Sequence, residues 1–276
     1  PAAERARRDH RHTLGELAYL RLDYAFMRHG PWEATASYSF FQTINQDLPE
    51  FNVQNHLGAV SGLYRGEAGD WPYQLGLAYA YDYFTLDDDE FVQRHTAGLL
   101  ALLAAGPRHL SALQARLQVK EFSDDTRGTI DTAEVRDAHN WMVGLLHVLR
   151  FDGDRHLLRG GWQVDVEDAE GRNFSYLGHR FLVGGQYTLP WGGTRLRYDG
   201  DLHLRDYRHA HTLLPESRPR SRERHDRELT HVVRIEQPLP WSLTLIAEYQ
   251  AIIARSNLPL YSFTRNLYTL NVSWQY

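Results

Sequence analysis

The sequence predicts an all-β protein, a transmembrane antiparallel β-barrel of about fourteen strands, and three observations support this prediction. Apolar and polar residues alternate along most of the chain, the alternating stretches are long, and short and long links alternate between them. Strands of soluble proteins average about five to six residues, whereas a tilted strand needs about nine to eleven to cross a bilayer. Since the stretches here run to about ten residues or more, they favour a membrane barrel over a soluble β-sandwich.

Composition agrees with a barrel and excludes several other classes. The 276-residue chain has no cysteine, which excludes a disulfide scaffold and a thiolate metal site. The net charge of −5 gives no argument for nucleic-acid binding. The uncharged run 96–107 is too short for a membrane-spanning helix. The mean hydropathy of −0.52 does not argue against a barrel, because alternation hides the apolar residues from an average.

About thirteen stretches are predicted as strands, each bounded by a link. In chain order they are residues 16–27, 32–43, 56–65, 71–84, 95–105, 109–121, 139–150, 156–167, 179–189, 194–206, 229–237, 242–254 and 263–276. Consecutive pairs of strands are joined by HGPW, RGEAGDW, AGPRH, FDGDR, LPWGG and PLPW. Glycine and proline give these short links the special φ angles or the stiff bends of tight turns.

Every second link is longer, as in outer-membrane barrels with short periplasmic turns and larger external loops. A histidine lies near the start of the strand after each long link, so that a hairpin of about 40 residues repeats. These histidines, expected at the level of the lipid headgroups, are His12, His56, His95, His139, His179 and His225.

The strand order predicts how the chain is organised in the membrane. Residues 1–12 are expected to form an N-terminal connector or external loop, and residues 13–276 the barrel. If the last strand ends on the periplasmic side, counting back through the links makes the first visible strand descend from outside. A rising strand is therefore expected upstream, which gives an even total of about fourteen.

Residues 194–206 show which face of a strand is expected to meet lipid. Leucine and tyrosine alternate there with arginine, aspartate and histidine. Because charged groups are costly in hydrocarbon, the apolar face should meet lipid and the charged face should line the lumen. The charged side chains would form cross-strand ion pairs in a wet interior, or the surface of a channel.

The residues expected to line the lumen are Arg21, Asp23, Arg116, Lys120, Arg159, Asp165, Glu167, Arg180, Arg195, Arg197, Asp199, Asp201, Arg205, Arg234 and Glu248. The aromatic residues expected to face lipid are Tyr73, Tyr79, Tyr81, Tyr83, Trp162, Tyr198, Tyr249, Tyr268, Trp274 and Tyr276.

The longest link, residues 206–228, is predicted to be an external basic loop. It would be solvated and mobile, or it would dock the phosphates of lipopolysaccharide or an acidic partner, because guanidinium binds phosphate in a bidentate manner. Its arginines are Arg208, Arg218, Arg220, Arg222, Arg224 and Arg227.

Several segments resemble one known family. The links FDGDRH and LPWGGTRLRYDGDLHLRDY and the closing ARSNLPLYSFTRNLYTLNVSWQY are similar to the C-terminal barrels of tetratricopeptide-linked outer-membrane proteins, such as the surface lipoprotein assembly modifiers. The resemblance implies a barrel of about fourteen strands that helps client proteins reach the cell surface, preceded by a periplasmic helical-repeat domain. No such helical repeat is found in this chain, and no functional residue is carried over from the family.

The expected function is therefore a transport or export channel in the outer membrane of a Gram-negative bacterium, assisting the translocation or surface display of a macromolecular client. The alternatives are a passive diffusion porin, a barrel that sheathes a partner protein, and an outer-membrane lipid hydrolase. The expected partners are outer-membrane lipids and lipopolysaccharide, with a client or plug protein and the helical-repeat domain. Neither a cofactor, a metal nor nucleic acid is expected.

The protein is not expected to be an enzyme, because no G-x-S-x-G motif is present, and no catalytic residue is assigned. His147 nevertheless falls on the apolar face of its strand with Val143, Leu145 and Leu149, where a polar group is costly. A bulge or a register shift is one explanation. A lipid-acting histidine, served by Ser111 from a neighbouring strand, is the other.

Overall fold

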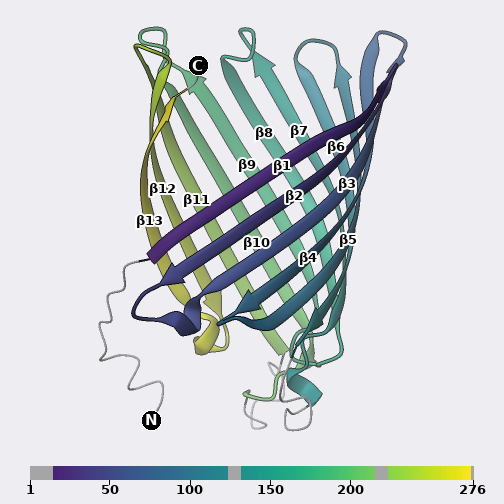
Figure 1. The fold of residues 1–276 in the computed structure, drawn as a ribbon, viewed down its shortest axis with the longest axis vertical. Coiled ribbons are helices and arrows are strands. Elements are labelled where there is room, and N and C mark those ends of the chain that lie inside the picture. Colours follow the sequence, from purple (N-terminus) through teal and green to yellow (C-terminus); the bar gives the residue numbers. More distant parts are fainter. Residues whose placement is uncertain (1–14, 124–131, 215–222, 275–276) are drawn as a thin grey trace.

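The computed structural model describes residues 15–123, 132–214 and 223–274, which form one antiparallel sheet of thirteen strands (Figure 1). The strands are β1 (Gly15–His29), β2 (Trp32–Asn45), β3 (Val53–Ala68), β4 (Trp71–Leu86), β5 (Asp89–Ala105), β6 (His109–Phe122), β7 (Ala138–Phe151), β8 (His156–Ala169), β9 (Tyr176–Thr188), β10 (Arg195–Ala210), β11 (Glu223–Leu239), β12 (Leu243–Ser256) and β13 (Phe263–Trp274). Three short 3-10 helices lie in the links: η1 (Pro49–Phe51), η2 (Thr132–Glu134) and η3 (Pro259–Tyr261).

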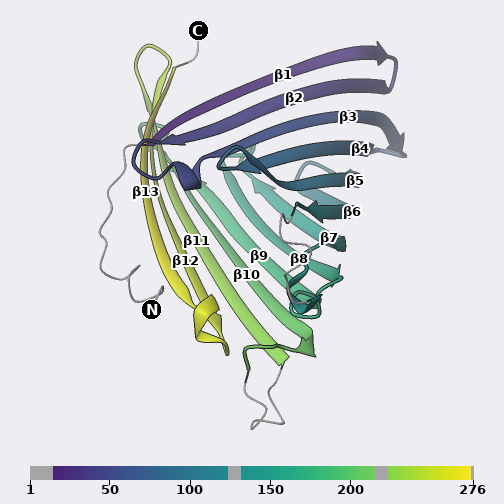
Figure 2. The same ribbon diagram turned by 60° about the horizontal axis from the view of Figure 1, so that its bottom comes forward.

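Each strand pairs with the strands before and after it in the chain, so the sheet is a simple meander from β1 to β13. The sheet curls around on itself, and Figure 2 shows the curved wall from a second direction. The predicted all-β antiparallel barrel fold is thereby confirmed. None of the helices in the described ranges is long and apolar enough to cross a membrane.

The two ends of the sheet differ in the length of their links. Tight turns gather at the end where the chain finishes, the upper end in Figure 1, and longer links lie at the opposite end. Gly69 and Gly106 occupy these tight turns with φ angles of 63° and 75°, a region that glycine adopts at little cost. We call these two ends the turn end and the long-link end.

The connection between β4 and β5 corrects one prediction. The sequence TLDDDEFVQ was expected to be a long link, but β4 continues to Leu86 and β5 begins at Asp89. Asp87 and Asp88 form a two-residue turn with φ angles of 54° and 64°. Aspartate tolerates this left-handed region better than most residues, and such a turn suits the twist of a hairpin.

The sheet has two free edges, at β1 and β13. Neighbouring strands are paired along the whole meander, but no ladder joins β1 to β13 within the described residues. In both views the start of β1 lies beside β13 (Figures 1 and 2). Both strands run from the long-link end to the turn end, so direct pairing between them would be parallel. The upstream fourteenth strand therefore stays a prediction.

Candidate channel surface

The polarity of the sheet is the reverse of that of a soluble protein. Leu77 and Val272 each expose 66% of their surface, whereas Asp82, Glu167 and Glu236 expose between 5% and 8%. A soluble protein buries apolar residues and exposes carboxylates. A closed sheet with an apolar exterior and a polar interior is typical of a transmembrane barrel.

The register places every predicted lumen residue on one face of the sheet, which we call the inward face. Within the ladder, Arg195 faces Glu236 and Arg234 faces Glu248, so acids and bases meet across neighbouring strands. Side chains on this face contact each other, which agrees with the concave side of the curved sheet. The lumen-lining role itself stays a prediction.

Strands β8 to β12 carry a dense set of ion pairs on the inward face, which we call the charge ladder. Arg180 Nε lies 3.1 Å from an Asp201 carboxylate oxygen, and Arg159 pairs with Asp199. Further members are Arg195 and Arg197 with Glu236, Arg205 with Glu228, Arg234 with Glu248, and His203 with Asp165, while Lys120 of β6 reaches Glu167 from outside this group of strands. Most acids and bases on this wall therefore neutralise each other locally.

Arg21 and Asp23 lie apart from the charge ladder, on the edge strand β1. They form a pair within that strand, with Arg21 Nε 2.9 Å from Asp23 Oδ2, and both are exposed. Arg116 lies on β6 and donates to the Asn140 side-chain oxygen at 3.0 Å. These three predicted lumen residues therefore share the inward face with the ladder but are separate from its pairs.

The opposite part of the inward face, on β2 to β7, has smaller and less charged side chains. A cavity of about 560 Å³ opens on this wall. Its inward lining includes Thr35, Ser61, Ala78, Thr96 and Gln114. Small hydroxyl, amide and alanine side chains leave space that a charged ladder would fill, so the two walls of the interior differ in bulk and in charge.

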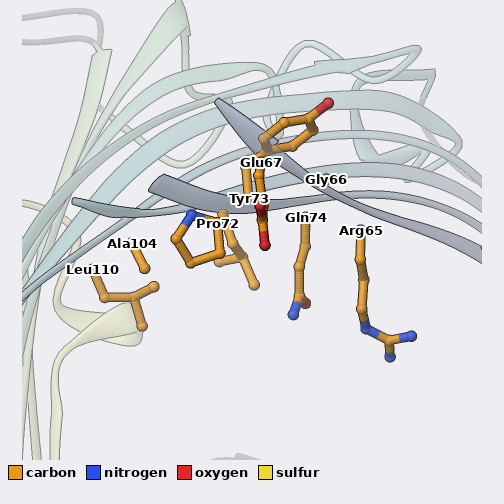
Figure 3. Close-up of a pocket in the computed structure, with 9 residues that line it drawn as sticks. Arg65, Gly66, Glu67, Pro72, Tyr73, Gln74, Ala104 and Leu110 are labelled. Carbon is orange, nitrogen blue, oxygen red and sulfur yellow. The ribbon is translucent and has the colours of Figure 1, made fainter. Parts of the chain in front are cut away.

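A second cavity, of about 520 Å³, lies nearer the turn end (Figure 3). Arg65 and Gln74 point to one side of the sheet there, and the Tyr73 ring points to the other. The Arg65 guanidinium is held by Glu33 at 2.7 Å. This view shows the alternation directly, because adjacent residues of β4 project into different environments.

The predicted lipid-facing aromatic residues lie on the outward face, except that Tyr276 falls outside the described residues. Tyr268 exposes 79% of its surface and Trp274 exposes 65%. Other exposed tryptophans, Trp71 and Trp241, lie at the turn end. Aromatic residues at the ends of the apolar band are typical of barrels in membranes, but lipid contact itself stays a prediction here.

Three of the repeated histidines, His56, His95 and His179, lie on the outward face and contact an aromatic residue of the preceding strand, whereas the equivalent position before His139 holds Leu117, the register partner of Trp141. The Tyr38 hydroxyl lies 2.8 Å from His56 Nδ1, the Tyr79 hydroxyl lies 2.7 Å from His95 Nδ1, and His179 stacks on Trp162. In each case the histidine lies two residues before the register partner of the aromatic residue.

His231 occupies the equivalent position on β11, where the Tyr198 hydroxyl lies 2.8 Å from His231 Nδ1. The sequence repeat had assigned His225 to this position, but His225 pairs with Asp206 instead. The strands β10 and β11 extend further than predicted, which moves the start of the strand away from the repeated position. His12 lies outside the described residues.

His147 projects from the outward face without a bulge, as its strand pattern indicated. Ser111 is its register partner, and the Ser111 hydroxyl lies 2.9 Å from His147 Nδ1. His109 Nδ1 lies 3.3 Å from His147 Nε2 on the same face. These contacts satisfy polar groups beside an apolar surface and explain how the histidine is tolerated there.

The predicted basic loop is shorter than residues 206–228, and three of its arginines belong to strands. Arg208 lies within β10, whereas Arg224 and Arg227 lie within β11. Arg224 is buried, binds Asp226 with Nη2 at 2.6 Å, and lies over the rings of Tyr207 and Tyr261. Apolar and polar residues do not alternate at the polar ends of these strands, so the strand ends could not be predicted from the pattern. Arg218, Arg220 and Arg222 lie outside the described residues.

Three long links meet in a hydrogen-bonded junction that sequence reasoning missed. The buried side chain of Asn173 donates to Glu134 of η2 and, at 2.8 Å, to the Thr212 hydroxyl. The Thr212 backbone N–H donates back to the Asn173 side-chain oxygen at 3.1 Å. The adjacent His211 is buried, and this burial, with the nearby Arg224 guanidinium, lowers the pKa of His211 below its ordinary value.

No metal centre is formed by the described residues, which contain no cluster of three or more suitable histidine or acidic side chains.

No family model and no curated protein matches this chain. Solved structures of outer-membrane porins do resemble it. OprD of Pseudomonas aeruginosa is 10% identical with a TM-score of 0.46, and the match covers 94% of this chain and 89% of OprD. OccK5 (OpdH) of the same organism is 12% identical with a TM-score of 0.41, covering 95% and 98%. OccAB3 of Acinetobacter baumannii is 9% identical with a TM-score of 0.44, covering 94% and 90%.

These comparisons correct the family prediction. The similar structures are OprD and Occ porins and not tetratricopeptide-linked assembly-modifier barrels, so the resemblance to the surface lipoprotein assembly modifiers was wrong. The hairpin and turn patterns that suggested it are required of any membrane barrel, and they do not distinguish one family from another.

The inverted polarity and the antiparallel meander of the sheet are those of an outer-membrane β-barrel. Nothing in the comparisons supports the translocation of a protein client.

Proposed function

We propose that the protein is a passive diffusion channel for small hydrophilic solutes. The observation that carries the proposal is the inward face, which holds buried carboxylates and arginines in ion pairs while apolar side chains cover the outward face. A hydrated solute can exchange contacts with such a surface, whereas an apolar lining would exclude it. Barrels of about eight strands are filled by side chains and those of about sixteen to eighteen leave an aqueous channel. The thirteen strands described here lie between these sizes and exceed the filled one.

The two walls of the interior suggest how a solute would be handled. The charge ladder on β8 to β12 offers donors and acceptors at short intervals, so a charged group can pass from one pair to the next. The wall on β2 to β7, with the cavity of about 560 Å³, offers space. We infer that the channel accepts small polar or charged solutes that lie with their charged groups toward the ladder.

Reconstitution of the purified full-length protein into planar lipid bilayers tests the proposal. We expect stable conductance steps that scale with salt concentration, together with swelling of proteoliposomes in small sugars or amino acids. A heat-unfolded sample of the same preparation is the control for leak. A folded, inserted protein that passes neither ions nor small solutes would contradict the proposal and favour a filled barrel.

A further inference from the structure

The outward face of β11 and β12 carries two arginines that face each other across the strands. Arg227 and Arg255 are direct register partners, and both are exposed. Arg227 projects outward because the next residue, Glu228, projects inward and pairs with Arg205 at 3.1 Å. The two arginines therefore project from directly opposite positions on the outward face, at the long-link end of the sheet.

This arrangement lacks an anion within the protein. Like charges directly opposite in an antiparallel pair destabilise the sheet. Among the described residues, no ion pair joins either arginine to a carboxylate, and the outward Asp206 is bound to His225 at 2.8 Å. Two adjacent, exposed guanidinium groups without an acid between them form a site for an external anion.

Apolar side chains continue directly from the arginines toward the turn end. Leu204 is the register partner of Arg227 on β10, and Leu229 and Ile253 follow on the same face. The surface therefore joins two cationic groups to an apolar wall. A soluble anion would use only the first part, whereas an amphiphile with phosphates at its head and acyl chains below would use both.

We propose that Arg227 and Arg255 bind the phosphates of the lipid A part of lipopolysaccharide on the outside of the barrel. Long links lie on the external side of outer-membrane barrels, so the site faces the leaflet in which this lipid is found. Guanidinium groups bind phosphate oxygens in bidentate fashion, and two of them suit a headgroup with more than one phosphate. The inference does not depend on the channel activity.

Binding of purified lipid A to the detergent-solubilised full-length protein tests this assignment, with native mass spectrometry as the readout. The variant Arg227→Gln/Arg255→Gln should bind lipid A at least tenfold more weakly than the unchanged protein. Arg108→Gln is the matched control, because Arg108 is an exposed arginine in a turn at the opposite end and should leave binding unchanged. Heat-dependent migration in gels and circular dichroism establish that each variant is folded.

Two further probes identify the ligand. Lipid A from which the phosphates have been removed should bind the unchanged protein as weakly as lipid A binds the double variant. Phosphatidylglycerol, which has one phosphate, should bind less tightly than lipid A and should lose less binding than lipid A does in the double variant. The assignment would be overturned if lipid A bound the double variant as tightly as the unchanged protein. It would also be overturned if the double variant lost phosphatidylglycerol binding and lipid A binding to the same extent.

Discussion

Asp199 and Asp201 lie on the inward face of β10, where each neutralises an arginine of another strand. Asp199 pairs with Arg159, and Asp201 lies 3.1 Å from Arg180. Asp199→Asn/Asp201→Asn would leave both arginines without their partners and make this wall more positive. We expect the anion-to-cation permeability ratio to rise by about twofold or more, since local charge concentrates counter-ions. The measurement is the reversal potential in a salt gradient.

Asp152 provides the control for that experiment. It lies in the tight turn after β7 and pairs with Arg155 at 3.3 Å, so Asp152→Asn removes one carboxylate charge, half the number that the double variant removes, at a place away from the ladder. Its reversal potential should match that of the unchanged protein. Identical values for the double variant and for the Asp152 variant would show that the ladder does not face the permeation path.

Gly171 tests the packing of the long-link junction. A Cβ atom at this position would lie 2.2 Å from the carbonyl oxygen of Val135 and 2.7 Å from that of Ala133. Because both atoms belong to the backbone, Gly171→Ala should destabilise the folded protein by about 1–3 kcal/mol. Denaturant unfolding in detergent measures the change. Gly58→Ala is the control, since nothing lies within 4 Å of the added atom, and an equal loss in both variants would contradict this account.

At the scale of elements, His211 couples the junction to pH. It lies just after β10, buried beside Arg224, and its pKa is lowered by burial and then by that guanidinium. A lowered histidine pKa in the folded state means that protonation opposes folding, so the contribution to stability is present above about pH 6.5, the unfolded value, and is lost as the pH falls.

Hydrogen exchange measures this coupling. The backbone amide of Thr212, which donates to Asn173, should have a lower protection factor at pH 5.5 than at pH 8. His211→Asn should abolish the difference, because asparagine does not titrate in this range. A protection factor that is independent of pH in the unchanged protein would argue against the coupling.

The strands were predictable where apolar and polar residues alternate and not beyond. Residues 194–206 alternate between an apolar outward face and a charged inward face, so the faces of β10 could be predicted from the sequence, although the strand continues to Ala210. Arg224 and Arg227 lie at the end of a strand where both faces are polar. The alternation of apolar and polar residues that indicates a strand is absent there. The β4–β5 turn was missed for a similar reason, because its acidic residues are typical of both loops and hairpin turns.

The interior was predictable to the level of faces but not of partners. Alternation assigned Asp165 to the polar face, and the structure adds that its carboxylate binds His203 and the Tyr176 hydroxyl at 3.0 and 2.8 Å. Such partners depend on register, which a single sequence leaves open. The Asn173 junction joins residues from three links and had no sequence signal at all.

At the scale of the whole molecule, the free edges of β1 and β13 need a partner in the membrane. Unpaired backbone groups are costly in lipid, so an open sheet does not span a bilayer. Because both edge strands run in the same direction, one additional strand between them would be antiparallel to each and give an even total of fourteen.

Solid-state NMR of the membrane-inserted full-length protein tests this closure. We expect each edge strand to show contacts with one further antiparallel strand. Direct contacts between β1 and β13 in a parallel register would contradict the prediction and would give an odd-numbered barrel.

The central claim is that apolar side chains of the sheet face lipid and charged ones face water. Since the chain has no cysteine, single-cysteine variants along β10 at positions 196 to 202 can each carry one spin label. In liposomes, labels at 196, 198 and 202 should collide mainly with oxygen dissolved in lipid, and labels at 197, 199 and 201 mainly with a water-soluble nickel complex. The account predicts this strict alternation with a period of two. Labels at 196, 198 and 202 that are shielded from both reagents would show a dry core behind the apolar face and would contradict the account.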